Sequence, residues 1–501
     1  MPNNTHEQLR PFVSNLDQRV FAITGLPEEV IAALLARYSR SRDDLRTNLN
    51  RLLAEDSLAI DTSNRTTTCG AEDKARAFHE KWAVGYGHAS VAEHAVVHLA
   101  VEQVSIIASK SIEDLRLGSF TEKSTRYVVF DTGSFADLAE LPSTLHDAYR
   151  TTCMGLFADY LDMFRQVEAR LDQVMPKQNE HPPSQRASAI RAHTCDLLRG
   201  LLPASTLTNL GITANARALA ILLRKMLSSP LREVRSVAEQ MRTEASTVAP
   251  TLLRYVESSP YRTTLRDSLL NATTRSTSLC TTSSQTKSAS AVRIVRYDRD
   301  ALQRIALALC YDLDTQPHAE FRMAVLDQQD SNTLAAIIQC AFVNRGEHDP
   351  APRAMEASHI TVELELDYGA YRDLQRHRML TPAVQILGCS LGPTLPSGLE
   401  LLGVLDRYQR ALGRVVPVWQ RLVDHDAFSA QYVVPLAYRI RTLWTLNLRE
   451  VFHVIELRSA RQGHASYRGV AQALYREVCR IHPWLADLIR VDLSEHTLAR
   501  G

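Results

Sequence analysis

Apolar residues recur every three or four positions along most of this chain, the spacing that places them on one face of a helix. From Pro27 to Leu53 acidic side chains come early and arginines late, as a helix dipole favours, so this segment predicts one amphipathic helix or two short ones. The same spacing predicts helices over 75–84, 136–174, 186–256 and 298–313. Between Gly87 and Phe130 β-branched runs alternate with turn residues, which predicts strands.

A polar segment separates the chain into two halves. Twelve of the twenty residues from Asn271 to Ser290 are serine or threonine. Such a stretch buries little apolar surface and predicts a linker or mobile loop. We therefore expect a first domain over 20–265, a linker over 266–292 and a second domain over 293–490. The length of 501 residues agrees, because it exceeds what one ordinary hydrophobic core accommodates.

The second half repeats spacings of the first half. Pro435 is followed twelve residues later by Asn447 and then by Arg449. Pro203 is followed at the same distances by Asn215 and Arg217, and Glu356 stands where Glu93 stood. Several matches in the same order indicate an internal duplication.

Composition limits the partners. Hydrophobic residues make up 45% and charged residues 23% of a chain with a formal net charge of +1, as in a globular protein without a global field for nucleic acid. The eight cysteines are scattered without a CxxC pair, which is typical of free thiols in a reducing compartment. The sequence shows neither a signal peptide nor a run long enough to span a membrane. We expect a cytoplasmic protein that binds neither nucleic acid nor membrane.

Two short stretches carry candidate chemistry. Arg376, His377 and Arg378 stand consecutively, where a helix or strand end would aim them at an anion or a ring, although a solvated basic turn is the alternative. The stretch Gly118–Tyr127, GSFTEKSTRY, is the second, and the two look like halves of one site.

Neither a metal site nor a thiol nucleophile is expected. His94 and His98 lie four apart near His88 and Glu93, but they lack the third ligand at a defined spacing that zinc helices have, so we expect structural histidines. Cys389 has no visible base partner and is expected to be an ordinary cysteine.

Together these residues resemble the signatures of the flavin-dependent thymidylate synthase family. Those signatures are H-x-S-x-x-E-H, an RHR triplet, E-x-S-x-R and N-x-R. The first is found at His88, Ser90, Glu93 and His94, and the triplet at Arg376–Arg378. The chain resembles two tandem, diverged copies of the family domain. The resemblance implies an α+β fold with two similar domains, each a small antiparallel or mixed sheet packed with long helices.

The two halves divide the signatures between them. In the first half the triplet position reads Asp114, Leu115, Arg116, whereas Glu122, Ser124 and Arg126 keep E-x-S-x-R. In the second half the triplet is intact, but the later positions read Val384, Ile386 and Gly388. The family arginine four residues before the proline is Arg199 in the first half and Gln431 in the second. The arginine eleven residues after the asparagine is Arg458 in the second half and Met226 in the first.

In the family one subunit supplies the triplet and the last arginine, and its partner supplies the other pieces. The surviving residues would therefore assemble one live composite site, as expected if a symmetric dimer had been fused and had lost one of two equivalent sites. The sequence leaves open whether the halves meet within one chain or between chains.

The resemblance implies a role for each surviving residue. Arg458, Arg376 and His377 are the expected catalytic residues. FAD is expected to be held by Arg376, His377, Arg378, Asn447, Arg449, His453 and Ser90, with Asn215 and Arg217 as further candidates. A pyrimidine nucleotide is expected to be bound by Asp373, Arg376, Glu122, Ser124, Thr125, Arg126, Arg199 and Arg458, because charge-assisted donors suit its phosphate.

Two positions depart from the family. Asp373 replaces a glutamine that meets the nucleotide, and a carboxylate cannot donate as an amide does, so a pyrimidine nucleotide other than deoxyuridylate is a hypothesis here. His453 replaces an asparagine that contacts FAD, and its imidazole can still donate a hydrogen bond.

The implied function is transfer of a one-carbon unit from methylenetetrahydrofolate to C5 of deoxyuridylate or a related pyrimidine nucleotide. FAD reduced by NADPH is the hydride source. The alternative is a catalytically silent, duplicated protein that binds nucleotide or flavin or acts as a scaffold. Dimerisation of the two-domain chain would reproduce the family's tetramer, so we expect a homodimer.

Overall fold

A computed structural model describes residues 8–18, 21–38, 41, 43–54, 89–175, 183–274, 291–313 and 318–495. The chain forms two compact units. Unit 1 comprises Met1–Val104, Ala108–Lys123 and Thr208–Thr282, and unit 2 comprises Ser105–Ile107, Ser124–Leu207 and Ser283–Gly501. These units do not coincide with the sequence halves, because segment Ser124–Leu207 of the first half packs with the second half.

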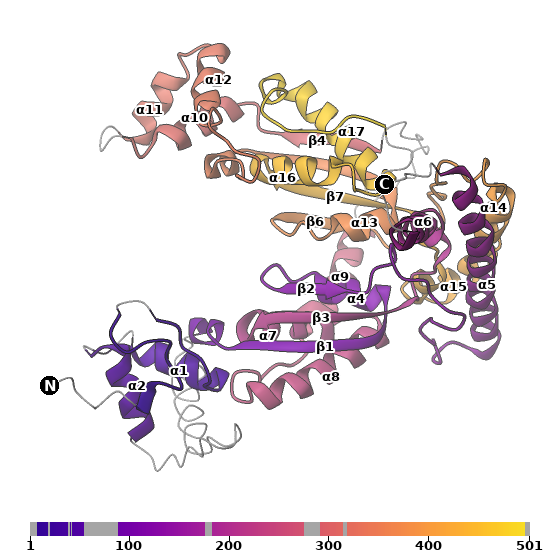
Figure 1. Ribbon diagram of the computed structural model, residues 1–501, viewed down its shortest axis with the longest axis horizontal. Coiled ribbons are helices and arrows are strands. Elements are labelled where there is room, and N and C mark those ends of the chain that lie inside the picture. The colour runs from indigo at the N-terminus through magenta and orange to yellow at the C-terminus, as the bar shows by residue number, and fades with distance from the viewer. Residues whose placement is uncertain are drawn as a thin grey trace. The chain divides into compact units, whose positions relative to one another are not determined.

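Unit 1 contains a three-stranded sheet with the strand order β1-β3-β2. Its strands are β1 (Val96–Ser105), β2 (Ser119–Glu122) and β3 (Leu207–Asn215), and β2 pairs antiparallel with β3. Its helices are the short η3 (Ala89–Glu93) and the α-helices labelled in Figure 1, which are α1 (Glu28–Tyr38), α2 (Leu45–Ala54), α4 (Ile106–Glu113), α7 (Ala216–Leu227), α8 (Arg232–Val248) and α9 (Pro260–Thr274). The sequence prediction of helices over 27–53 is confirmed as two short helices, α1 and α2.

Two sequence expectations fail in this region. The segment 186–256, predicted as helical throughout, contains strand β3, whose side chains alternate between buried and less buried positions. That two-residue period is a strand signal which the apolar helices on either side obscured. The loop predicted from Asn271 onward also begins later than expected, because helix α9 continues to Thr274. The rest of the serine- and threonine-rich stretch, like the predicted helix 75–84, lies outside the described residues.

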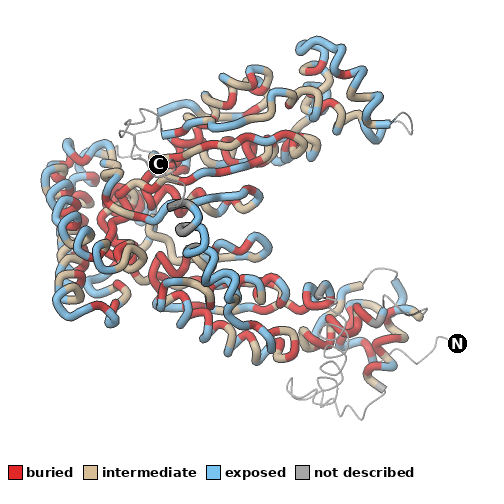
Figure 2. The backbone as a smooth tube through the Cα atoms, turned by 180° about the vertical axis from the view of Figure 1, so that it is seen from behind, coloured by how far each residue is buried: buried red, intermediate tan, exposed pale blue. Residues whose placement is uncertain are grey.

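Unit 2 is built on a four-stranded antiparallel sheet with the order β4-β5-β7-β6. Its strands are β4 (Val292–Tyr297), β5 (His359–Asp367), β6 (Leu380–Val384) and β7 (Arg439–Asn447). The central pair runs in register from His359 opposite Asn447 to Asp367 opposite Arg439. Alternate residues of β5 and β7 are buried, and buried stretches of both units are drawn red in Figure 2. Helices α16 (Leu448–Ser459) and α17 (Ala465–Ile481) pack on this sheet.

A helical layer of unit 2 comes from both sequence halves. The first half supplies α5 (Ser143–Val174), α6 (Pro183–Leu198) and η4 (Arg199–Leu201). The second half supplies α14 (Leu405–Gly413), α15 (Val415–His425) and η6 (Ser429–Val433). Helix α5 packs against α6, α14 and α15. The helical structure predicted over 136–174 is confirmed, as one long helix that begins at Ser143. The remaining helices of unit 2 are α10 (Ala301–Cys310), α11 (Ala319–Leu326), α12 (Ser331–Cys340), η5 (Arg353–Ala357), α13 (Tyr368–Leu374) and η7 (Pro483–Leu485).

The two repeat prolines meet directly inside unit 2. Pro203 and Pro435 form an antiparallel bridge. Ala204 N donates to Val434 O at 2.8 Å, and Leu436 N donates to Leu202 O at 2.9 Å. This pairing joins the end of η4 to the segment before β7, and it fixes Arg199 beside the second half.

The α+β architecture expected from the resemblance is confirmed, with antiparallel sheets packed against helices. Among the described helices, none combines the length and apolar character needed to cross a membrane.

Candidate functional site

The RHR triplet follows helix α13 in unit 2. Asp367 caps this helix, because its Oδ1 accepts a hydrogen bond of 2.8 Å from Ala370 N. The helix ends at Leu374, and the chain then turns, with His377 N donating to Leu374 O. Outside the helix the three side chains take different environments: Arg376 is exposed, His377 is buried and Arg378 is half-buried.

His377 lies between a carboxylate and a guanidinium. Its Nδ1 is 2.9 Å from Glu450 Oε1, and its Nε2 accepts a hydrogen bond of 2.8 Å from Arg458 Nε. Since Nε2 accepts, the ring proton is on Nδ1 and is donated to Glu450. Burial lowers the pKa of His377 to about 4, so the ring is neutral near pH 7. A neutral His377 orients Arg458 without adding a charge.

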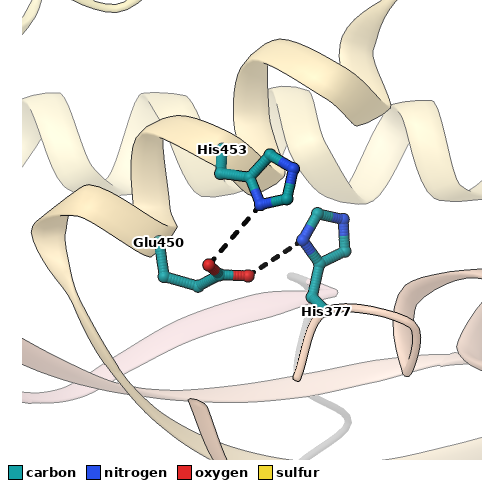
Figure 3. Close-up of side chains that lie close together, drawn as sticks. All are labelled: His377, Glu450 and His453. Atoms are coloured by element: carbon teal, nitrogen blue, oxygen red, sulfur yellow. Dashed lines mark hydrogen bonds and ion pairs between the residues drawn. The ribbon is translucent and has the colours of Figure 1, made fainter. Parts of the chain in front are cut away.

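Glu450 and His453 complete a cluster on α16 that Figure 3 shows beside His377. Burial alone would raise the pKa of Glu450, but hydrogen bonds with His377 and His453 hold it at about 2. Asn447 caps the helix by accepting from Glu450 N at 2.8 Å, which fixes the carboxylate. The sequence analysis missed Glu450, although its place three residues after the N-x-R asparagine offered a signal.

These three side chains also have the spacing of metal ligands. The ligand atoms of His377, Glu450 and His453 lie within 4.8 Å of one another. Both nitrogens of His377 are engaged, and the Arg458 cation lies against one of them. A divalent cation would be repelled there and would displace Arg458, so the geometry favours the hydrogen-bonded arrangement.

Of the histidines considered for metal in the sequence, His98 contacts Thr213 Oγ1 at 2.8 Å, and His88 lies outside the described residues.

We expect the stability of the protein to depend on His377 below neutral pH. Its pKa is about 4 in the folded state and near 6.5 when unfolded, so the unfolded state binds more protons in this window. The stabilising contribution is complete above about pH 6.5 and is lost as the pH falls towards 4. His377→Asn should therefore flatten the loss of unfolding free energy between pH 6.5 and 5 by about 1.5 kcal/mol in urea titrations. The exposed His453→Asn is the matched control, and an equal flattening there would contradict the assignment.

Arg126 from the first half lies against α17 of the second half, within unit 2. Its Nε and Nη2 donate to the two carboxylate oxygens of Asp196 at 2.8 and 3.0 Å, and its Nη1 donates to Tyr467 Oη at 2.9 Å. Arg458 approaches the same ring, with its Cζ 5.6 Å from the centroid against 5.5 Å for Arg126. Tyr467 therefore links the surviving arginines of the two halves.

Ser124 and Thr125 precede Arg126 in a turn. Ser124 Oγ accepts from Arg126 N at 3.2 Å, which orients the start of this turn. Asp196 was not identified from the sequence, although it precedes Arg199 by three residues at the end of α6 and so lies near it.

Arg199 meets the position that departs from the family. It is only 4% exposed, and its Nη1 donates to Asp373 Oδ2 at 2.9 Å. Burial would raise the pKa of Asp373, but Arg199 and Arg126 hold it below its usual value, so the carboxylate is charged. In this structure the Asp373 carboxylate neutralises Arg199, a contact that the sequence analysis did not foresee.

The residues expected to hold the rest of FAD have clear contacts within the fold. Arg449 donates to Glu356 at 2.8 Å and to Ala351 O at 2.9 Å. The first half repeats this arrangement in unit 1, where Asn215 caps α7 and Arg217 pairs with Glu93. The two halves thus share the contacts of these residues as well as their spacing in the sequence, which supports the internal duplication.

The remaining donors around His377 fit an anionic dinucleotide. Arg376 is exposed, and His453 has 59% of its side chain exposed beside the triplet. Guanidinium cations and a donating imidazole are suitable partners for phosphates and for a ring that gains negative charge. The other candidates belong to unit 1, where Ser90 is exposed and Glu122 accepts from Ser109 Oγ at 2.7 Å.

The equivalent cluster of the first half has become apolar. Counted from the N-x-R asparagines and the triplet, His377, Glu450 and Arg458 correspond to Leu115, Ala218 and Met226. All three replacements are buried in unit 1. In place of the hydrogen-bonded cluster of charged and polar side chains, the first half carries apolar side chains that need no hydrogen-bond partners when buried. This copy therefore lacks the polar side chains that the proposed chemistry needs.

Fold and site thus define a duplicated α+β protein whose surviving cationic residues from both halves gather in one compact unit. The chain belongs to the flavin-dependent thymidylate synthase family, since the family model described as "Thymidylate synthase complementing protein" matches residues 23–251 and 293–484.

Similar proteins include full-length and partial relatives. A "UPF0159 protein" of Chlamydia muridarum is 34% identical over 511 residues, covering 99% of this chain and 96% of that protein. A "UPF0159 protein" of Thermoplasma acidophilum is 28% identical, covering 93% of this chain and 96% of that protein. A "Flavin-dependent thymidylate synthase" of Thermococcus kodakarensis is 33% identical over 75 residues, which are 15% of this chain and 31% of that protein.

Proposed function

We propose that this protein is an FAD-dependent enzyme that transfers a one-carbon unit to C5 of a pyrimidine nucleotide, at one composite site per chain. One observation carries the proposal. The surviving family residues of the first half, Arg126 and Arg199, lie in hydrogen-bond contact with Tyr467 and Asp373 of the second half inside unit 2. The site is therefore proposed to form within one chain.

The two arginines are proposed to bind the nucleotide phosphate. Asp196 and Asp373 now hold them in place by charge-assisted hydrogen bonds. A dianionic phosphate would share or exchange these contacts, so the carboxylates orient the guanidinium groups and tune their affinity. Ser124 Oγ adds a neutral donor in the same turn.

Arg458 is proposed to face the pyrimidine. Its Nε is tied to His377, which leaves the rest of the guanidinium group to stabilise negative charge that develops on the ring. Glu450 keeps His377 in the tautomer that accepts from Arg458. Arg376 and Arg378 are proposed to lie along FAD, which supplies the hydride when it is bound and reduced by NADPH, while methylenetetrahydrofolate supplies the carbon.

The alternative is a silent nucleotide- or flavin-binding protein, and the apolar residues at the equivalent positions in unit 1 are consistent with that alternative for the first copy. The ion pairs and hydrogen bonds that hold Arg126, Arg199 and Arg458 in unit 2 support an active site there. As for the assembly, we propose a homodimer of the two-domain chain, which size measurement in solution tests.

Flavin content tests the proposal directly. The purified protein is expected to be yellow, or to become so with FAD, and its flavin absorbance should bleach with NADPH. Deoxyuridylate and methylenetetrahydrofolate should then restore the oxidised spectrum and yield a C5-alkylated nucleotide. A colourless preparation that FAD cannot reconstitute would support the silent alternative.

A further inference from the structure

A cavity of about 290 Å³ adjoins Arg199 in unit 2. It is lined by residues at the end of α6 and in η4, by the start of α13, by the loop 394–397 and by the start of α17. Apart from Arg199, it is lined by none of the residues assigned above to nucleotide or flavin. Asp373, which engages Arg199 Nη1, does not line it either.

Two buried polar atoms that lack a partner among the described residues belong to side chains that line this cavity. Arg199 is 4% exposed and its Nη2 is unpaired, whereas Tyr408 is fully buried with an unpaired hydroxyl. A buried donor without a partner costs about 1–3 kcal/mol, so a ligand group that accepts hydrogen bonds from both atoms would remove this cost at the cavity wall.

Glycines lie against both side chains, one beside the Tyr408 hydroxyl and one beside the guanidinium group of Arg199. A Cβ at Gly200 would lie 2.1 Å from Tyr408 Oη, and a Cβ at Gly369 would lie 3.4 Å from Arg199 Nε. Both glycines line the cavity. Any larger residue at position 200 would displace the tyrosine hydroxyl from its place at the cavity wall.

The two carboxylates and the His464 ring on the cavity wall are already engaged. Asp196 accepts twice from Arg126, and Asp367 accepts from Ala370 N and Ser466 Oγ. His464 donates from Nε2 to Asp196 O and accepts at Nδ1 from Ser466 N, so it is neutral. The two buried, unpaired groups of the wall, Arg199 Nη2 and the Tyr408 hydroxyl, can both donate and one is a cation, so they suit an anionic oxygen pair rather than a cation.

The rest of the wall is apolar. Leu197, Leu395, Pro396 and Leu436 line it, and the volume is close to that of the smaller ligand pockets known in proteins. A bare phosphate would leave these side chains without contact. A compact molecule with one acidic end and one apolar end uses both parts of the wall.

We propose that this cavity binds a small organic carboxylate. Arg199 Nη2 and the Tyr408 hydroxyl hold the carboxyl group, and the apolar body lies against Leu197, Leu395 and Leu436. Arg199 then serves two ligands from its two amino groups. The proposal concerns binding alone and stands independently of the reaction proposed above.

Titration calorimetry of the full chain with sodium benzoate tests this, in the absence of flavin and nucleotide. Benzoate should bind at one site per chain, and at least about 10-fold more tightly than benzamide, the neutral isostere. Tyr408→Phe removes only the hydroxyl and should weaken benzoate about 5-fold. Tyr160→Phe, which alters an equally buried tyrosine outside the cavity, should leave the affinity unchanged.

A second variant that blocks the cavity tests the proposal even if Tyr408→Phe fails to fold. Ser397 is exposed and lines the cavity, so Ser397→Phe should obstruct it without disturbing the core, and benzoate binding should disappear. Equal affinity for benzoate and benzamide, full affinity in Ser397→Phe, or no binding of benzoate at millimolar concentration would each overturn the proposal. The flavin experiment is unaffected by any of these outcomes.

Discussion

Arg376→Ala is expected to lower nucleotide turnover by about 10²–10³-fold, the loss typical when a donor that stabilises developing charge is removed. The side chain is exposed at the end of α13 and beside His377, so its removal should leave the fold intact. Arg116→Ala, which alters the arginine that remains in the degraded triplet of the first half, at the position of Arg378, should change turnover by less than about 3-fold, because that half carries Leu115 and Met226 in place of His377 and Arg458.

Steady-state kinetics with reduced flavin, together with NADPH-dependent bleaching, measure this contrast. Thermal unfolding of both variants serves as the control for folding. Equal losses of activity in the two variants would show that the model of one live site per chain is wrong.

Asp373→Ala is expected to destabilise the protein by about 3–5 kcal/mol, because it leaves the buried Arg199 cation without its carboxylate. Asp373→Asn keeps an oxygen acceptor for Nη1 and should cost less. Urea unfolding provides the measurement. Glu363→Ala, which breaks an ion pair with the 63%-exposed Arg293, should cost no more than about 1 kcal/mol.

A loss for Asp373→Ala as small as that for Glu363→Ala would mean that Arg199 does not depend on this carboxylate.

The same position tests the choice of nucleotide. Asp373→Gln restores the family's residue, and if it left the preference among pyrimidine nucleotides unchanged, the hypothesis of a substrate other than deoxyuridylate would fail.

The site was only partly predictable from the sequence. The divided signatures led to the prediction that Arg126 and Arg199 complement residues of the second half, because a duplicated chain retains the spacing of its ancestor. Both arginines contact the second half in the structure, through Tyr467 and Asp373, and their role in a composite site stays a prediction. The residues that fix these side chains were not recognised. Asp196, Glu450 and Tyr467 lie outside the signatures. The positions of Asp196 and Glu450, each three residues from a signature residue, offered a local signal, whereas the contact of Tyr467 with Arg126, 341 residues away, did not.

The sequence by itself determined the helices α1, α2 and α5 through its hydrophobic pattern, and it determined the duplication and the split between an intact and a degraded triplet through the spacing of its motifs. Local periodicity and spacing are properties of neighbouring residues, so they can be read without a fold. The tertiary structure alone decided that Arg199 meets Asp373, 174 residues away, and that segment 124–207 packs with the second half. Such contacts depend on sheet register and on the Pro203–Pro435 pairing, which bring distant segments together only once the chain has folded.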